Sequence, residues 1–474
     1  MVLNTSKCEL FHINPEAKNA DDIKNFKIIA PDIKIIDSTE LILLGAPILP
    51  DAYDTTLESK HAELTRMIAR MSNIDRHDAF YLLKNSVAIP KLLFYLRSTP
   101  LHENNILSNM DLTLRTGLEK ILNVKMEPNI WKQASLPVKM GGLGIRSFHE
   151  LSLPAFISSF YKSKDIMAII SPKTFNDEPY ADAIAAEDKW MNIPGITQND
   201  YPKDTDIQRN WDLPICKLSL NMLIEETHDA TTLARLKAVS HEHSSDWLDA
   251  IPNANLGLKL ENQQFRIAVA LRLGANVCHS HTCICGKNVS SDGIHGLSCQ
   301  RSAGRHPRHS HINDLIKRAC ISGGTSAIRE PQGVSRVDGK RPDGMSQYPW
   351  KNGRLLLWDF TCVDTVAPSH VNDSAKCPGK AANDAETKKI NHYSNLTQSY
   401  NFVPVCIETY GVFGDLGIAF IKDLGKMIIS QTGEKRATAF LFQSIGIAMQ
   451  RGNALSILGT IKQDEDPLHE IYQL

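Results

Sequence analysis

The 474-residue sequence lacks any apolar run long enough to cross a bilayer and any signal-like segment at its N-terminus. Its longest apolar stretch, LILLGAPILP, falls short of the roughly 20 residues that a membrane-spanning helix needs. It also lacks a charge excess, with 52 Lys and Arg against 53 Asp and Glu. Ten cysteines without a signal segment indicate a reducing compartment and thiols free to bind metal. The sequence therefore predicts a soluble, intracellular protein with no membrane segment and roughly two to four domains.

Local patterns divide the chain into regions of different character. Residues 1–52 contain three predicted strands, FKIIA, IKIID and ELILLGAPIL. Apolar residues then recur at helical spacing from Leu57 to Met71, and Asp75 is the predicted N-cap of a second helix. A Pro/Gly-rich connector at 134–147 precedes further predicted helices, which the polar linker PGITQNDYPKDTDIQRN interrupts. Beyond residue 311 helices and strands alternate, which predicts an α/β domain.

A cysteine–histidine segment separates the helical region from the α/β region. Its ligand-type residues follow the pattern C-x-C-x₉-H-x₃-C, at Cys283, Cys285, His295 and Cys299. Zinc favours four such ligands, often as two closely spaced pairs, so the pattern predicts a zinc site. Gly286 and Gly296 would supply the backbone freedom of the two turns. Cys278 or His281 could replace one ligand, and the alternative is a loop of free thiols and surface histidines.

A basic stretch overlaps and follows this segment. Residues 283–342 hold ten Lys and Arg against four acids, inside a chain that is neutral overall. Such a local excess predicts a surface that binds the phosphates of nucleic acid, and the alternative is a solvated basic face. The predicted contact residues are Arg301, Arg305, Arg308, His309 and Arg341.

Two aspartates stand in unusual places in the stretch RPDGMSQYPWKNGRLLLWDFTCV. Asp359 lies within a run typical of a buried strand, where an ionised carboxylate costs several kcal/mol unless it is paired or binds a metal. A hairpin through SQYPWKNGR would bring it to Asp343, and oxygen ligands of this kind suit Mg²⁺. Glu330 is a candidate third acid, and Lys388 or Lys389 a candidate for orienting or activating water. The alternative is that Asp343 is a turn residue and Asp359 is a strand-end residue exposed by the twist of the sheet. Lys388 and Lys389 would then belong to a solvated helix face.

Seven blocks of the sequence, in order, resemble the C-terminal part of a non-LTR retrotransposon polyprotein of the class with a restriction-like endonuclease. The blocks are LNTSKCELF, LLGAPIL, ASLPVKMGGLGI, CICG…IHGLSC…GRHPRHSHIND, EPQG…KRPDG…LLLWDFTCVDTVAPSH, KKINHY and FVPVCIETYGVFG.

The resemblance implies a multidomain α and α/β protein. Its expected parts are a reverse-transcriptase palm remnant (1–52), a helical thumb (53–150), a helical linker (151–275), a CCHC zinc knuckle with a basic segment (276–310) and a PD-(D/E)xK restriction-like endonuclease (311–474). In the family this nuclease nicks chromosomal DNA, and the freed 3′ end primes reverse transcription of the element RNA. The implied partners are therefore target DNA and element RNA, the cofactors Mg²⁺ and Zn²⁺, and the location the nucleus.

The resemblance also assigns individual residues. Asp343 and Asp359 match the metal-binding acids, and Lys389, four residues before Tyr393, matches the family's lysine, with Lys388 as the alternative. Glu330 and Glu408 fall on family blocks with less defined roles. Cys283, Cys285, His295 and Cys299 match the zinc knuckle.

Three departures from the family pattern bear on activity. The sequence has no stretch of the YADD or FADD type, so this chain alone lacks the acids that nucleotide addition needs. Thr361 stands where many such nucleases keep lysine, so the lysine must come from the following helix. His392 replaces the basic residue expected beside the tyrosine. The alternative hypotheses are a catalytically inactive nucleic-acid-binding remnant and a decayed copy of the element.

Overall fold

The computed structural model describes residues 4–13, 20–170, 180–336 and 338–461. Contacts group the chain into two compact units. Unit 1 draws on residues 1–70, 85–114 and 146–215, and unit 2 on residues 71–84, 115–145 and 216–474. Among the described residues, no helix combines the length and apolar character needed to span a membrane. The five-part domain division stays a prediction.

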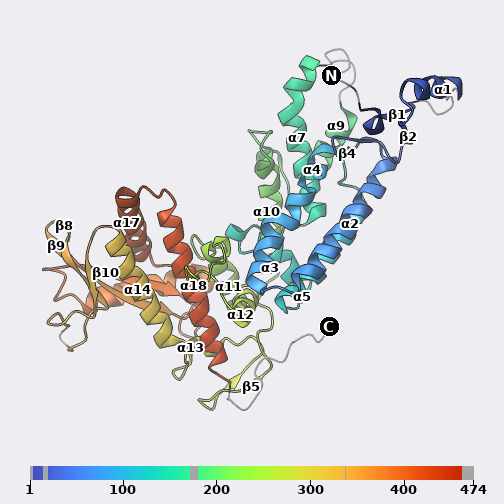
Figure 1. Cartoon of the computed structure of the whole chain (residues 1–474). Helices are drawn as coiled ribbons and strands as arrows, with labels where there is room; N and C mark the ends of the chain where they lie inside the picture. The colour runs from blue at the N-terminus through green and yellow to red at the C-terminus, as the bar shows by residue number, and fades with distance from the viewer. Residues whose placement is uncertain (1–3, 14–19, 171–179, 337, 462–474) are drawn as a thin grey trace. The chain divides into compact units, whose positions relative to one another are not determined.

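Unit 1 is mainly helical, with two small two-stranded sheets near its N-terminus (Figure 1). Its elements are η1 (Thr5–Lys7), β1 (Glu9–Phe11), α1 (Ala20–Ile29), β2 (Lys34–Ile36), β3 (Ile42–Leu43), β4 (Ala46–Pro47), α2 (Asp51–Met71), α4 (Ile89–Ser98), α5 (Asn105–Leu122), α7 (Phe148–Ile170), α9 (Ala181–Met191), η5 (Gln198–Asp200) and α10 (Gln208–Glu225). The residues of α2, α5, α10 and the short helix η3 (Leu83–Val87) divide between the two units.

One of the three predicted N-terminal strands is wrong. FKIIA forms most of the second half of α1 rather than a strand, whereas IKIID contains β2 and ELILLGAPIL contains the hairpin β3–β4. The reason lies in the pairing of β1 with β2, which is parallel, with Glu9 opposite Lys34. Parallel strands cannot be joined by a tight turn and need a crossover connection, which α1 provides.

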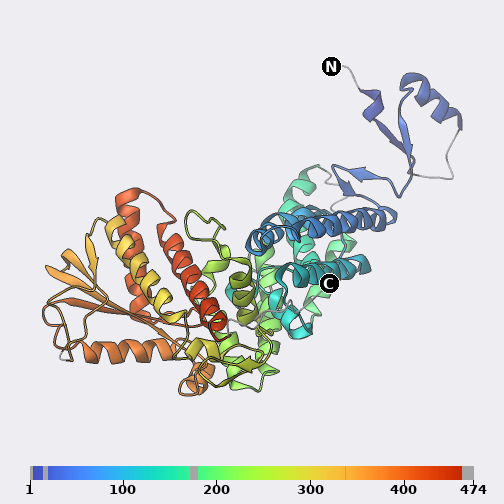
Figure 2. The ribbon, with the colours of Figure 1, turned by 60° about the horizontal axis from the view of Figure 1, so that its bottom comes forward.

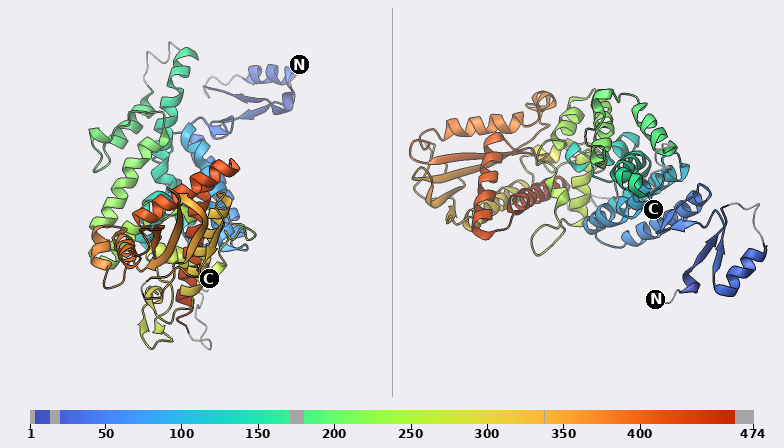
Figure 3. Two further views of the ribbon diagram at one scale, coloured as in Figure 1. Left: turned by 90° about the vertical axis from the view of Figure 1, so that its left-hand side faces the viewer. Right: turned by 90° about the horizontal axis from the view of Figure 1, so that it is seen from above.

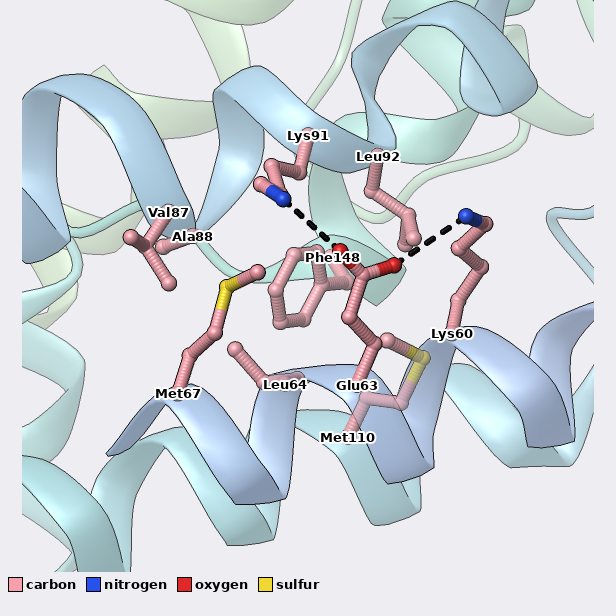
Figure 4. Close-up of a pocket in the computed structure, with 10 residues that line it drawn as sticks. All are labelled: Lys60, Glu63, Leu64, Met67, Val87, Ala88, Lys91, Leu92, Met110 and Phe148. Carbon is pink, nitrogen blue, oxygen red and sulfur yellow. Dashed lines mark hydrogen bonds and ion pairs between the residues drawn. The ribbon is translucent and has the colours of Figure 1, made fainter. Parts of the chain in front are cut away.

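The predicted helix beyond residue 54 is confirmed as α2, and an ion-pair cluster joins it to α4 (Figure 4). Glu63 of α2 pairs with Lys91 of α4 at 2.7 Å and with Lys60 at 3.1 Å. The space that this cluster borders, lined by Leu64, Phe148 and other apolar side chains, measures only about 10 Å³. That volume is about one water molecule, so we interpret the cluster as structural.

Unit 2 combines helices, the cysteine–histidine segment and a four-stranded sheet. Its elements are α3 (Arg76–Leu82), η3 (Leu83–Val87), α6 (Pro128–Ala134), η4 (Val138–Met140), α11 (Ala230–Val239), η6 (Asp246–Asp249), α12 (Asn262–Leu273), β5 (His281–Thr282), β6 (Asn288–Val289), α13 (His295–Ser298), α14 (Arg305–Ser322), β7 (Ala327–Arg329), β8 (Gly344–Lys351), β9 (Arg354–Val363), α15 (Val371–Lys376), α16 (Lys380–His392), β10 (Asn401–Glu408), α17 (Asp415–Thr432) and α18 (Ala437–Leu458). The predicted helix after Asp75 is therefore α3.

The sheet of unit 2 has the strand order β10-β9-β8-β7. β9 pairs with β8 antiparallel, as the predicted hairpin requires, and with β10 parallel. Asn352 and Gly353 make the hairpin turn with φ values of +53° and +72°, the left-handed conformation that tight hairpin turns demand. At the other end of the hairpin, a Cβ on Gly344 would lie 1.9 Å from the indole of Trp358, so only glycine fits there.

The sheet lies between α16 on one face and α14 and α17 on the other (Figures 2 and 3). Alternate residues of β9 face each layer, and Trp358 and Phe360 join the main core with residues of α14, α17 and α18. Asp359 points to the other face, where α16 covers it. A charged residue can occupy this buried strand because the side chains of one helix meet it there.

A buried histidine in the helical part of unit 2 gives a pH-dependent stability. His77 is 2% exposed, stacks on Phe265 with 4.4 Å between ring centroids, and accepts a hydrogen bond from the Leu260 backbone N–H through Nδ1. Burial lowers the pKa of His77 to about 4. The unfolded chain, with a pKa of about 6.5, binds the proton first, so stability is lost as the pH falls from 6.5 towards 4.

We expect wild type to lose about 3 kcal/mol of unfolding free energy over this range from His77 alone. His77→Asn, whose amide oxygen can still accept from Leu260, should flatten the profile. Denaturant unfolding at pH 7 and pH 4, followed by tryptophan fluorescence, measures the difference. Trp247 lies 6.0 Å from Phe265 and reports on this region. If the unfolding free energy fell by the same amount from pH 7 to pH 4 in both proteins, the prediction would be contradicted.

Candidate functional site

The predicted zinc ligands meet at one point of unit 2. The ligand atoms of Cys283, Cys285, His295 and Cys299 all lie within 4.8 Å of one another. The sulfurs of Cys283 and Cys299 are 3.8 Å apart, and the sulfur of Cys285 is 3.3 Å from Nε2 of His295. Two sulfurs each about 2.3 Å from a tetrahedral zinc ion would be about 3.8 Å apart. The spacing of this cluster therefore suits Zn²⁺.

Short elements hold this cluster in place. The strands β5 and β6 form an antiparallel hairpin that carries Cys283 and Cys285, and α13 begins at His295. Gly286 has φ +87° in the turn, as predicted. Gly296 plays a different part from the one predicted: it has no positive φ, and a Cβ there would lie 2.8 Å from Cα of Ile457 in α18. Its small size allows the segment to approach α18 closely.

The cluster also favours a thiolate at one position. The pKa of Cys285 is lowered to about 6 because the backbone N–H of Lys287, and then the side chains around it, stabilise the anion. The two alternative ligands lie outside the cluster. Cys278 contacts the carbonyl of Ser290 at 3.6 Å, and His281 contacts its own neighbour His279 and the hydroxyl of Thr460. The Cys₃His set could therefore bind zinc with the four residues that the spacing predicted.

The predicted acidic site lies at the centre of the sheet, around Asp359. This residue is 4% exposed, and its Oδ1 accepts a hydrogen bond of 2.8 Å from the hydroxyl of Tyr393. Its Oδ2 contacts the ammonium group of Lys389. Burial, followed by repulsion from the carboxylate of Asp343, raises the pKa of Asp359, while Lys389 and Tyr393 oppose this increase. The carboxylate of Asp343 is therefore close enough to disfavour ionisation of Asp359.

Asp343 is held at the start of the hairpin by two contacts. Its Oδ2 accepts a hydrogen bond of 2.7 Å from the backbone N–H of Phe360 and lies 3.0 Å from Nε2 of His309. The Asp343 carboxylate raises the pKa of His309, although burial of the ring opposes the effect. His309, predicted to bind nucleic acid, thus lies against a predicted metal ligand.

The lysine of this site comes from α16. Lys389 is partly buried and contacts Asp359, whereas Lys388 is exposed and makes no contact with Asp359 in the described structure. Tyr393, four residues after Lys389, is 1% exposed and stacks on Phe402 with 4.4 Å between ring centroids. The Lys–x₃–Tyr spacing places both side chains on one face of the helix, so the sequence held a signal for Tyr393 that reasoning from charge alone missed.

Among the described residues, neither glutamate forms a hydrogen bond or an ion pair with Asp359. Glu330 is exposed and pairs with Arg341 at 3.3 Å, although its backbone N–H bonds to the carbonyl of Asp343 at 2.9 Å. Glu408 is the last residue of β10 and is fully buried against the start of α16. Its Oε1 accepts a hydrogen bond of 3.3 Å from the backbone N–H of Ala382. Burial raises the pKa of Glu408.

The five predicted nucleic-acid contacts are placed differently from one another. Arg301, Arg305 and Arg341 are exposed. Arg308 is only 5% exposed, and its guanidinium donates a hydrogen bond of 2.6 Å to Asn453 of α18. Arg308 therefore links α14 to α18, and its side chain is not presented to solvent.

Comparison with known proteins gives one informative match. No family model matches the chain. The chain is 22% identical over 335 residues to the retrotransposable element SLACS 132 kDa protein of Trypanosoma brucei gambiense. The match covers 69% of this chain and 24% of that protein, so the chain spans about a quarter of its relative's length. This similarity supports a retrotransposon-related origin for the chain.

Proposed function

We propose that this chain carries a Mg²⁺-dependent DNA endonuclease of the PD-(D/E)xK restriction-like type, from a retrotransposon protein. It would nick target DNA, and the freed 3′ end would prime reverse transcription of the element RNA in the nucleus. The observation that supports this most is that Asp343, Asp359 and Lys389 lie close together, although they come from the loop before β8, from β9 and from α16. The relation to a retrotransposon protein supports the biological setting.

The residues present fit a hard divalent cation. Burial raises the pKa of the Asp359 carboxyl, and repulsion from the nearby carboxylate of Asp343 raises it further. A cation between such groups removes this repulsion, and Mg²⁺ prefers oxygen ligands of this kind. Asp343 and Asp359 would hold the ion, which when bound supplies a Lewis acid for phosphodiester hydrolysis.

The chain's own residues would orient the reacting groups. Lys389 would direct its ammonium group towards the attacking water and the charge that develops on the phosphate. Tyr393, fixed between Phe402 and the guanidinium of Arg336, which lies 5.1 Å from its ring centre, keeps Asp359 in a single orientation. Arg301, Arg305 and Arg341 would contact the DNA backbone, which fixes position without reading sequence.

Nicking of supercoiled plasmid by the zinc-loaded chain, with and without added Mg²⁺, tests this function. We expect Mg²⁺-dependent nicking that Lys389→Ala reduces by roughly 10²-fold, because a positioned charge at the reacting centre is worth about that much. Lys388→Ala is the matched control: it removes the adjacent, exposed lysine and should nick at the wild-type rate. Equal loss in both variants would contradict the role of Lys389.

Salt-sensitive DNA binding without any Mg²⁺-dependent nicking would instead favour an inactive nucleic-acid-binding protein. Fluorescence anisotropy with a labelled duplex at two salt concentrations, on the same preparation, separates these outcomes.

A further inference from the structure

A chain of polar contacts leads from the core of unit 2 to Asp343. Trp358 donates a hydrogen bond of 3.0 Å from its indole N–H to Oδ1 of Asn313. The amide nitrogen of Asn313 lies 3.3 Å from Nδ1 of His309, and Nε2 of His309 lies 3.0 Å from Oδ2 of Asp343. Trp358 and Asn313 are each no more than 1% exposed. This series of contacts therefore has a fixed buried end at Trp358 and a partly exposed end at the acidic site.

Hydrogen-bonding chemistry sets the direction of this chain. An indole N–H can only donate, so the oxygen of Asn313 must face Trp358 and its NH₂ must face His309. Nδ1 of His309 is then an acceptor, which leaves the hydrogen on Nε2, the nitrogen beside Asp343. The ring thus presents a donor to the carboxylate.

The two oxygens of Asp343 differ in what surrounds them. Oδ2 receives the Phe360 N–H and the His309 Nε2 contact. Within the described residues, Oδ1 has no hydrogen-bond partner. A carboxylate tied through one oxygen leaves the other for a ligand, and such supporting contacts orient metal-binding carboxylates.

From this geometry we propose that His309 is a positioning residue for Asp343: held by Asn313 and Trp358, it fixes the carboxylate so that Oδ1 can bind the divalent cation. This inference rests on the proposed function, and it reassigns His309 from the DNA-contacting surface to the support of the metal site. His309 acts through Asp343 and needs no contact with the substrate.

Two amide substitutions of His309 test the proposal. Glutamine places its amide nitrogen close to the position of Nε2 and can still donate to Asp343. Asparagine has its amide close to the position of Nδ1 and is too short to reach Asp343. We expect His309→Asn to weaken binding of the divalent cation by about tenfold, within the range for such supporting groups, and His309→Gln to stay near wild type.

The readout is Mn²⁺ binding to the zinc-loaded full chain without DNA, measured from free Mn²⁺ by electron paramagnetic resonance. Mn²⁺ accepts the same oxygen ligands as Mg²⁺. DNA affinity without added divalent cation, measured by anisotropy, should be the same for both variants and wild type. Circular dichroism of both variants checks that they fold like wild type.

Three outcomes would overturn the proposal. Unchanged Mn²⁺ affinity in His309→Asn would exclude positioning, and an accompanying fall in DNA affinity would return His309 to the DNA surface. Equal weakening in both variants would show that a donor at Nε2 is irrelevant. If wild type bound no more Mn²⁺ than Asp359→Asn does, the proposed function itself would fail, a result distinct from the first two.

Discussion

Asp359→Asn is expected to lower Mg²⁺-dependent plasmid nicking by about 10³-fold or more while leaving the fold intact. On the proposed function, the substitution removes a metal-binding charge worth several kcal/mol in the transition state, and each 1.36 kcal/mol is a factor of ten in rate. The amide oxygen can still accept from Tyr393, which now donates to Oδ1 over 2.8 Å. Nicking rates at several Mg²⁺ concentrations, with circular dichroism for the fold, measure the effect.

Asp364→Asn is the matched control for this variant. Asp364 is a half-buried aspartate just beyond β9, and burial raises its pKa as well. Its carboxylate accepts from the hydroxyl of Thr409 at 3.1 Å, away from Lys389 and Tyr393. Loss of nicking in both variants would indicate that neutralising either aspartate disturbs unit 2 in general. It would refute a specific role for Asp359.

Cys299→Ser should remove stoichiometric zinc from the chain and unfold the segment around it. Structural zinc contributes an apparent binding free energy of about 10 kcal/mol or more, and the small elements that hold these ligands bury little else. Zinc content by mass spectrometry after dialysis, together with hydrogen exchange over residues 277–300, measures both effects. We expect loss of one zinc per chain and loss of exchange protection in β5, β6 and α13.

Cys278→Ser provides the comparison, because Cys278 is also buried in this segment and packs against Cys283 and Cys299 but lies outside the ligand set. It should keep its zinc. Zinc retention by Cys299→Ser, or its loss from Cys278→Ser alone, would mean that the fourth ligand had been assigned incorrectly.

Features that depend on nearby residues were predictable from the sequence. The hairpin β8–β9 follows from Asn352-Gly353 between two strand-like runs, and the predicted zinc ligands lie within 17 consecutive positions. The family resemblance, together with the absence of an ammonium group on Thr361, also predicted a lysine from a later helix, and Lys389 of α16 contacts Asp359. Each of these inferences used short spacings or the chemistry of a single residue.

Features set by distant packing were not predictable in this way. Arg308 belongs to a basic run, yet its pairing with Asn453 comes from α18, far along the chain. The helix α1 was read as a strand because its apolar end, FKIIA, satisfies a strand pattern as well as a helical one. The link from Trp358 through Asn313 to His309 joins residues of two elements with no common motif.

The packing of α18 has a consequence for how the protein is made. This helix packs against α12, α13, α14 and α17, and Gly296, next to the predicted zinc ligand His295, lies against its residue Ile457. All these partners leave the ribosome before α18 does. Because contacts between residues far apart in sequence form late, we expect the zinc segment and the sheet to stay only loosely docked during synthesis. Once α18, which ends at Leu458, has left the ribosome, the zinc segment and the sheet would both dock against it.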